Sequence, residues 1–252
     1  MSTLLLRLAA PMQSWGVSSK FNRRMTNTEP TRSGVIGLLA AAMGIQRNEP
    51  LASFLPLKFG VRIDQPGTIQ RDFHMTHKKV GSKEISWLTH RYYIEDAVFL
   101  AAVEGKDEFL SALEYALHHP VYPLFLGRRS CPPTGRLVLG IRDKDLRTTL
   151  FEEDWQASPW YQKKSLRREL ETLDIVRDAG PEETGYAVRD LPQSFDQHRR
   201  LYQFRNIVRE QLPLKNILHE DSSKGTNNGP TATEYDPMDL LEEYDVSIKS
   251  QD

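Results

Sequence analysis

The segment PTRSGVIG, residues 30–37, combines residue types that suit the binding of a phosphate group. An apolar run follows it, so the segment is predicted to form the first turn of a buried helix. Free backbone N–H groups and the helix dipole attract anions at such a turn, and Arg32 and Ser33 add a cation and a hydroxyl. Gly34 and Gly37 lack side chains, which lets a ligand or another backbone approach closely. The alternative is a core helix surrounded by solvated arginines.

A second segment, GRRS, offers similar chemistry and ends at Ser130. Its glycine exposes backbone donors, Arg128 and Arg129 supply fixed positive charge, and the serine supplies a hydroxyl, all of which suit a phosphate backbone. Arg23 and Arg24 lie shortly before the first segment and add to the local positive charge. The alternative for GRRS is a turn between strands with exposed arginines.

Aromatic and cationic residues are interleaved in the polar loop at residues 10–29, which contains Gln13, Trp15, Lys20 and Phe21. Stacking rings beside cations are typical of sites for single-stranded nucleic acid. We therefore include Gln13, Trp15 and Lys20 among the candidate RNA-binding residues. The alternative is a surface loop whose rings pack onto the domain.

Residues 65–95 form an insertion rich in basic residues, which include Arg71 and His74, and the polar turn KVGSK divides it into two extended halves. This pattern predicts a protruding β-hairpin. His74 and His77 lie close in sequence, but no further ligands follow at a recognised spacing, so neither a metal site nor a cofactor is expected.

Composition and charge place the chain among globular proteins. It has 252 residues, of which 39% are hydrophobic, and Cys131 is its one cysteine, which fits a reducing cytoplasm. The apolar N-terminus is too short to span a bilayer, and no membrane association is expected. Residues 219–252 contain nine acidic residues and two lysines, a net charge of −7, which leaves +6 for residues 1–218. This composition predicts a flexible acidic tail behind a basic body, which is compatible with a nucleic-acid partner.

Hydrophobic periodicity predicts an α+β fold in which strand, helix, strand, strand, helix and strand follow one another. Thr31 or Ser33 is expected to cap the first helix, and Gly44 to end it. This order is that of a ferredoxin-like (RRM-like) unit, an antiparallel sheet with two helices on one face. We expect this unit over residues 1–141, with the hairpin inserted at about 65–95, and a smaller C-terminal α/β domain over 142–218. The expected elements of the unit are residues 3–9, 30–44, 57–64, 96–104, 106–120, and 121–126 with 136–141.

Four motifs together resemble the CasD family, the fifth-named Cas protein of type I-E CRISPR systems. They are RLAAPMQSWG (7–16), PTRSGVIGLLAAAMGI (30–45), RDFH (71–74) and FLGRRSCPPT (125–134). The resemblance extends from the N-terminus to about Thr134 and does not include the acidic tail. It implies a RAMP-superfamily body with a thumb hairpin.

The resemblance also implies a function in antiviral defence. Such a protein is a non-catalytic subunit of the Cascade ribonucleoprotein complex that holds the 5′ repeat-derived handle of the CRISPR RNA. Its partners would be the RNA, the backbone subunit and the large subunit, with target DNA contacted indirectly through the complex. Carried over by position, Gln13 and Trp15 would face the handle, residues 32–37 would face a phosphate, and residues 128–130 would form a glycine-rich RNA-binding loop.

An alternative function is metal-independent cleavage of repeat RNA, as the equivalent subunit of type I-C systems performs. This chemistry needs a base for the 2′-OH and an acid for the leaving oxygen. The candidates are His74, His77, Tyr92, Tyr93 and His118, but nothing in the sequence brings two of them to one phosphate. A protein scaffold without RNA contact is a third possibility, and it leaves the clustered arginines unexplained.

Overall fold

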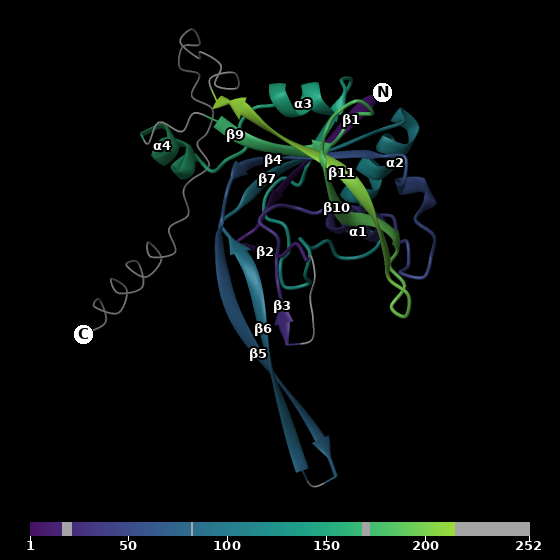
Figure 1. Cartoon of the computed structure of the whole chain (residues 1–252), viewed down its shortest axis with the longest axis vertical. Coiled ribbons are helices and arrows are strands. Elements are labelled where there is room, and N and C mark those ends of the chain that lie inside the picture. The colour runs from purple at the N-terminus through teal and green to yellow at the C-terminus, as the bar shows by residue number, and fades with distance from the viewer. Residues whose placement is uncertain (17–21, 82, 168–171, 215–252) are drawn as a thin grey trace, which may run out of the picture. The chain divides into compact units, whose positions relative to one another are not determined.

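The computed structural model describes residues 1–16, 22–81, 83–167 and 172–214. Its centre is an antiparallel seven-stranded sheet with the order β10-β11-β9-β4-β7-β1-β8, shown in Figure 1. The predicted mixed α+β fold is confirmed. The strands of this sheet are β1 (Ser2–Ala9), β4 (Lys58–Gln65), β7 (Val98–Gly105), β8 (Val138–Arg142), β9 (Thr172–Asp178), β10 (Tyr186–Ser194) and β11 (Leu201–Pro213).

Both faces of the sheet are covered, which explains the run of leucines in β1. Leu4, Leu6 and Leu8 point into one core, which α1 (Arg32–Ala42) and α2 (Asp107–His118) cover. Leu5 points into a second core on the other face, which contains residues of α3 (Leu146–Glu152). Side chains alternate between the faces of a strand, so a strand buried on both sides carries an unbroken apolar run.

The helix α1 begins and ends as its sequence predicts. The Thr31 side chain accepts a hydrogen bond from the Gly34 amide at 3.2 Å, which caps the first turn. Gly44 follows the helix with φ of +79°, a left-handed conformation that favours glycine.

The strand predicted at residues 121–126 is wrong. The amides of Val121 and Tyr122 instead donate to the carbonyls of Ala42 and Ala41, at 3.0 and 3.2 Å. These carbonyls end α1, where the Ala41 carbonyl also accepts from the Gly44 amide at 3.2 Å, so the segment bonds to the end of the helix rather than joining the sheet. Its place beside β1 is taken by β8.

The predicted hairpin is present as β5 (Thr68–Val80) and β6 (Lys83–Glu95), which pair in continuous antiparallel register. Figure 1 shows the two strands running together away from the seven-stranded sheet. At its base, β6 also pairs with the short strands β2 (Met12–Gln13) and β3 (Arg23–Arg24), which completes a second sheet.

The seven-stranded sheet continues past the domain boundary predicted at residue 142. The strand β9 pairs with β4, and β11 and β10 follow it in the same sheet. Leu173, Ile175 and Leu212 share a core with Leu5 and Leu100. The strands after residue 142 therefore extend the same sheet and the same core. The acidic tail, residues 219–252, lies outside the described residues.

The remaining helical elements are short. They are η1 (Ala52–Phe54), which precedes β4, and α4 (Pro159–Arg167), which precedes β9. None of the helices in the described ranges has the length and apolar character needed to cross a membrane. Within those ranges no cluster of three His, Cys, Asp or Glu side chains is placed to hold a metal ion.

Candidate nucleic-acid interface

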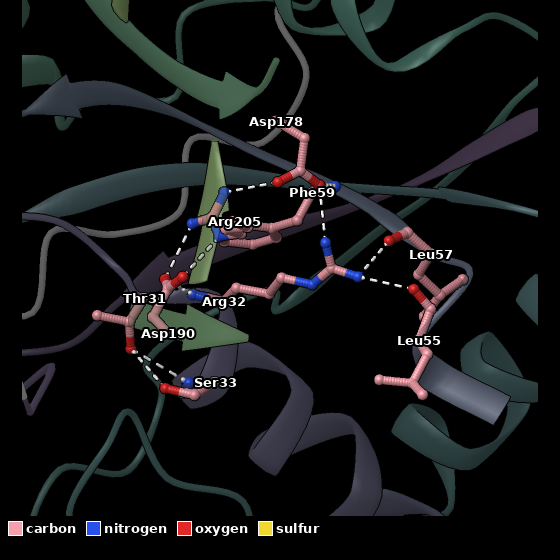
Figure 2. A network of polar contacts seen from close by, with 10 residues as sticks. Thr31, Arg32, Ser33, Leu55, Leu57, Phe59, Asp178, Asp190 and Arg205 are labelled. Carbon is pink, nitrogen blue, oxygen red and sulfur yellow. Dashed lines mark hydrogen bonds and ion pairs between the residues drawn. The ribbon is translucent and has the colours of Figure 1, made fainter. Parts of the chain in front are cut away.

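The anion at the start of α1 is supplied by the protein itself, as Figure 2 shows. The Arg32 amide donates to Asp190 Oδ2 at 2.8 Å, and this carboxylate also accepts two hydrogen bonds from Arg205, at 2.6 and 2.9 Å. The sequence predicts an external phosphate at this helix start. A carboxylate from β10 occupies that position instead, because the fold brings β10 across α1.

The Arg32 side chain is buried, and its two terminal nitrogens bond within the protein, which corrects its predicted role as a phosphate contact. Only 5% of the residue is exposed. Its guanidinium donates to Asp178 Oδ2 at 2.9 Å and to the carbonyls of Leu55 and Leu57 at 3.1 and 2.5 Å, as seen in Figure 2. Arg32 therefore joins α1 to β9 and to the segment before β4.

Charges alternate through this network, and the pKa values of its two arginines shift in opposite directions. Burial lowers the pKa of Arg32, and the neighbouring Arg205 lowers it further against the opposing effect of Asp178. For Arg205, burial lowers the pKa, but the ion pairs with Asp190 and Asp178 outweigh it and raise the pKa overall. Two carboxylates balance two guanidiniums, as a buried ionic network requires.

The structure also corrects the predicted RNA-facing role of Gln13 and Trp15, both of which are 0% exposed. The Gln13 amide donates to the carbonyls of Leu8 and Ala97 at 3.1 and 2.8 Å, and its oxygen accepts from Trp15 Nε1 at 3.1 Å. A Cβ on Gly34 would lie 2.7 Å from Trp15 Cε3. This glycine is therefore needed for the packing of Trp15 against α1. Lys20 lies outside the described residues.

A surface groove of about 790 Å³ runs beside the start of α1. Ser33, Gly34 and Gly37 line it from the helix. Arg129 lines it from the loop that follows Leu126, whose carbonyl accepts a hydrogen bond from the Ser14 amide. The groove therefore brings together parts of the two segments that the sequence singled out. The other cationic and aromatic residues that line it are Arg47, Tyr122, Phe125, Phe195, Arg200 and Tyr202.

The chemistry of this groove suits a single-stranded nucleic acid. Arg47, Arg129 and Arg200 are exposed, and among the described residues that line the groove none carries a carboxylate. Four aromatic rings provide surfaces on which bases can stack, and arginines bind phosphates through paired hydrogen bonds.

The adjacent residues Arg128 and Arg129 have different surroundings. Arg128 stacks over the Tyr93 ring, with its guanidinium carbon 4.6 Å from the ring centre, and donates to the Arg24 carbonyl at 2.8 Å. Burial raises the pKa of the Tyr93 hydroxyl, but hydrogen bonds from Ser130 and Arg128 lower it more, and the net shift is downward. Arg128 and Ser130 thus fasten the loop to the hairpin base, and Arg129 remains exposed in the groove.

A close backbone approach fixes this loop against β2. Gly127 has φ of +83°, and a Cβ at this position would lie 1.7 Å from the Ser14 carbonyl oxygen. The Ser14 amide also donates to the Leu126 carbonyl at 3.1 Å. Only glycine fits at position 127, which explains the glycine of the GRRS segment.

The remaining predicted residues lie on the hairpin and at its base. Arg23 and Arg24 form β3, which runs parallel to β6 opposite His90 and Arg91, and both are exposed. Arg71 is exposed on β5, and His74 Nε2 contacts Asp72 Oδ2 at 2.8 Å. None of these four residues is among those that line the groove.

Sequence analysis missed Arg47, Phe195, Arg200 and Tyr202. The sequence signal for the last three was the cluster QSFDQHRRLYQF, which mixes rings and cations as the loop at 10–29 does. Local periodicity does not predict β10, and without β10 no hairpin is expected at this cluster. Arg47 follows α1 without any motif of its own.

Comparisons with known proteins agree on one family. A family model described as "CRISPR-associated protein (Cas_Cas5)" matches residues 3–208. The chain is 38% identical over 158 residues to the Escherichia coli (strain K12) protein "CRISPR system Cascade subunit CasD", which covers 55% of this chain and 70% of that protein. A solved structure described as "CRISPR RNA-guided surveillance complex" matches with a TM-score of 0.69 and 33% identity, over 84% of this chain and 92% of that one. Another, "Crystal structure of Cas protein", matches with a TM-score of 0.67 and 35% identity, over 85% and 97%.

Proposed function

The chain belongs to the CRISPR-associated Cas5 family, which confirms the resemblance of its four motifs, and we propose on that premise that it is the CasD subunit of a Cascade surveillance complex. Within that complex it binds the 5′ handle of the CRISPR RNA and acts in antiviral defence in the cytoplasm. Its body is ferredoxin-like, built on β1, α1, β4, β7, α2 and β8 in the order that such a unit requires.

One observation carries this proposal, namely the groove beside α1. Three exposed arginines converge there with four aromatic rings, contributed by three separate parts of the chain. The bases of a single-stranded handle could stack on Tyr122, Phe125, Phe195 or Tyr202 while its phosphates pair with the arginines. Phosphate contacts of this kind set the register of the RNA without reading its sequence.

The hairpin supports the proposed contact with sister subunits. Phe73, Met75 and Leu88 lie on one face of it, with Met75 directly opposite Leu88. They are 64%, 55% and 45% exposed, which is high for large apolar side chains. We assign this face to contact with the backbone subunit. The large subunit is the second proposed protein partner, and target DNA is contacted only indirectly, through the complex.

We further propose that the subunit does not cleave RNA. His74 pairs with Asp72 on the hairpin, Tyr93 contacts Ser130 and Arg128 at the hairpin base, and His118 ends α2. Figure 1 shows α2 beside the seven-stranded sheet and the hairpin strands extending away from it. An acid and a base must reach the same phosphate for metal-independent cleavage, and His118 lies on a different element from the four candidates of the hairpin.

We expect no cleavage when the purified subunit is incubated with repeat RNA, with or without a chelator. The readout is gel analysis of 5′-labelled RNA. A discrete product ending in a 2′,3′-cyclic phosphate, lost in His74→Ala or His118→Ala, would instead establish the ribonuclease function.

We expect the tagged chain, expressed with its genomic neighbours, to purify with sister subunits and a discrete RNA of repeat-plus-spacer type. The physical reason is that the groove buries part of the handle, so the bound RNA survives purification. Sequencing of the extracted RNA identifies it, and the same preparation from cells without the repeat array is the control. Recovery of the chain alone, without RNA or sister subunits, would contradict the proposal.

A further inference from the structure

One wall of the groove comes from the edge of the seven-stranded sheet. Phe195 and Arg200 lie in the turn between β10 and β11, Tyr202 lies near the beginning of β11, and β10 is the outermost strand. An edge hairpin has neighbours on one side only, so its turn depends on few contacts for its position. We define this turn together with the adjoining ends of both strands, residues 191–203, as the groove flap.

The ionic network at the start of α1 includes Asp190 and Arg205, which lie close to the two ends of the groove flap in sequence. The pairing of β10 with β11 is irregular between Val188 and Leu191, and Asp190 lies within this irregularity. Leu191 then pairs with Gln203, which begins the flap. Asp190 and Arg205 therefore stand where the regular hairpin ends and the flap begins.

These two residues tie the flap to three other elements. The Asp190 carboxylate accepts from the Arg32 amide at 2.8 Å, which anchors β10 to the first turn of α1. Arg205 donates to Asp178 on β9 at 2.7 Å, and its guanidinium carbon lies 5.4 Å from the centre of the Phe59 ring on β4. The bidentate contact of Arg205 with Asp190 closes the network, as Figure 2 shows.

We infer that Asp190 and Arg205 are positioning residues, whose ion pair holds the groove flap over the start of α1 in the arrangement that binds RNA. The inference rests on the proposed function of the groove. Neither residue lines the groove, so each acts through the placement of Phe195, Arg200 and Tyr202. If the pair is weakened, the flap samples other positions, and the apparent affinity falls by the fraction of time that it is correctly placed.

The experiment measures RNA binding by Arg205→Lys and Asp190→Asn in the full chain, or in the assembled complex if the subunit needs its partners. Lysine keeps the charge of Arg205 but cannot form the forked contact with a carboxylate. If the flap is correctly placed about a tenth of the time, the dissociation constant for a single-stranded handle RNA rises about tenfold. The dependence on salt should stay unchanged, because the phosphate contacts formed in the bound state are the same.

The matched control is Arg177→Lys. Arg177 neighbours Asp178 on β9, its side chain is 8% exposed like that of Arg205, and it pairs with Glu183 and Glu210 rather than with the flap. A merely structural role predicts that Arg205→Lys and Arg177→Lys change the melting temperature and RNA affinity alike. Positioning predicts a loss of affinity, and faster hydrogen exchange over residues 191–203, in Arg205→Lys and Asp190→Asn only.

Arg200→Ala separates the two proposals. If Arg200→Ala weakens binding and lowers the salt dependence while Arg205→Lys and Asp190→Asn bind like Arg177→Lys, positioning is wrong and the groove stands. If Arg200→Ala and Arg129→Ala leave binding unchanged, the groove is not the RNA site and both proposals are overturned. If Asp190→Asn does not fold, the conservative Arg205→Lys decides between these outcomes.

Discussion

Replacing Arg47, Arg129 and Arg200 together by alanine is expected to weaken binding of the single-stranded handle RNA roughly a hundredfold. Each arginine is exposed in the groove and is assigned one phosphate, and a contact of this kind contributes about 1 kcal/mol. The slope of log affinity against log salt should fall by about 0.7 per lost contact, and therefore by about 2 in total. Filter binding or fluorescence anisotropy over a range of salt measures both quantities.

The control for this variant removes the same charge elsewhere. Lys106, Lys144 and Lys163 are exposed and do not line the groove, so their joint replacement by alanine tests the effect of net charge alone. We expect a much smaller loss of affinity in this control. Equal losses in the two triple variants would mean that the protein attracts RNA by its overall charge and that the groove is not the binding site.

Replacing Arg62 by methionine is expected to lower the free energy of unfolding by about 3–5 kcal/mol, because it leaves the buried carboxylate of Asp64 without its charged partner. Both side chains are 0% exposed. Arg62 contacts Asp64 Oδ1 and Oδ2 at 2.6 and 3.0 Å, and it also donates to the carbonyls of Leu150, Glu153 and Asp154 at 2.8, 2.6 and 2.6 Å. It therefore joins β4 to the segment around the end of α3.

Thermal or denaturant unfolding measures this effect, and Lys144→Met is the control. Lys144 pairs with Glu152 at the surface, where both side chains are more than half exposed, and such a pair contributes at most about 1 kcal/mol. Adding Asp64→Asn to Arg62→Met should restore part of the stability, since it removes the unpaired charge. A loss below about 1 kcal/mol in Arg62→Met would show that the pair contributes little to stability.

The effect of Arg62→Met on RNA binding should be small at temperatures where the variant is folded. Arg62 contacts residues from the end of α3 and the loop after it, whereas the groove lies beside α1. The two largest predicted effects therefore separate, one acting on RNA affinity and the other on stability.

Local sequence is sufficient to predict the order β1, α1, β4, β7, α2 and β8 and the presence of the hairpin. These features depend on local chemistry, such as the cap at Thr31, the left-handed Gly44 and the alternating pattern of the hairpin strands. The family followed from four motifs, each read within a short stretch of chain. The strand predicted at residues 121–126 is wrong, because the amides at the start of this apolar run bond to the last carbonyls of α1.

Which of the candidate residues face solvent depends on contacts between distant segments of the folded chain. Arg32 and Arg129 have similar sequence surroundings. Each is followed by a serine and has a glycine two residues away, in a segment suited to binding phosphate. Arg32 is buried because Asp178 and Asp190, 146 and 158 residues further along the chain, meet it across the sheet. Arg129 stays exposed because Arg128 takes the internal contacts of its loop. A guanidinium binds whichever anion the fold brings to it, and pairings between distant segments leave no trace in local sequence.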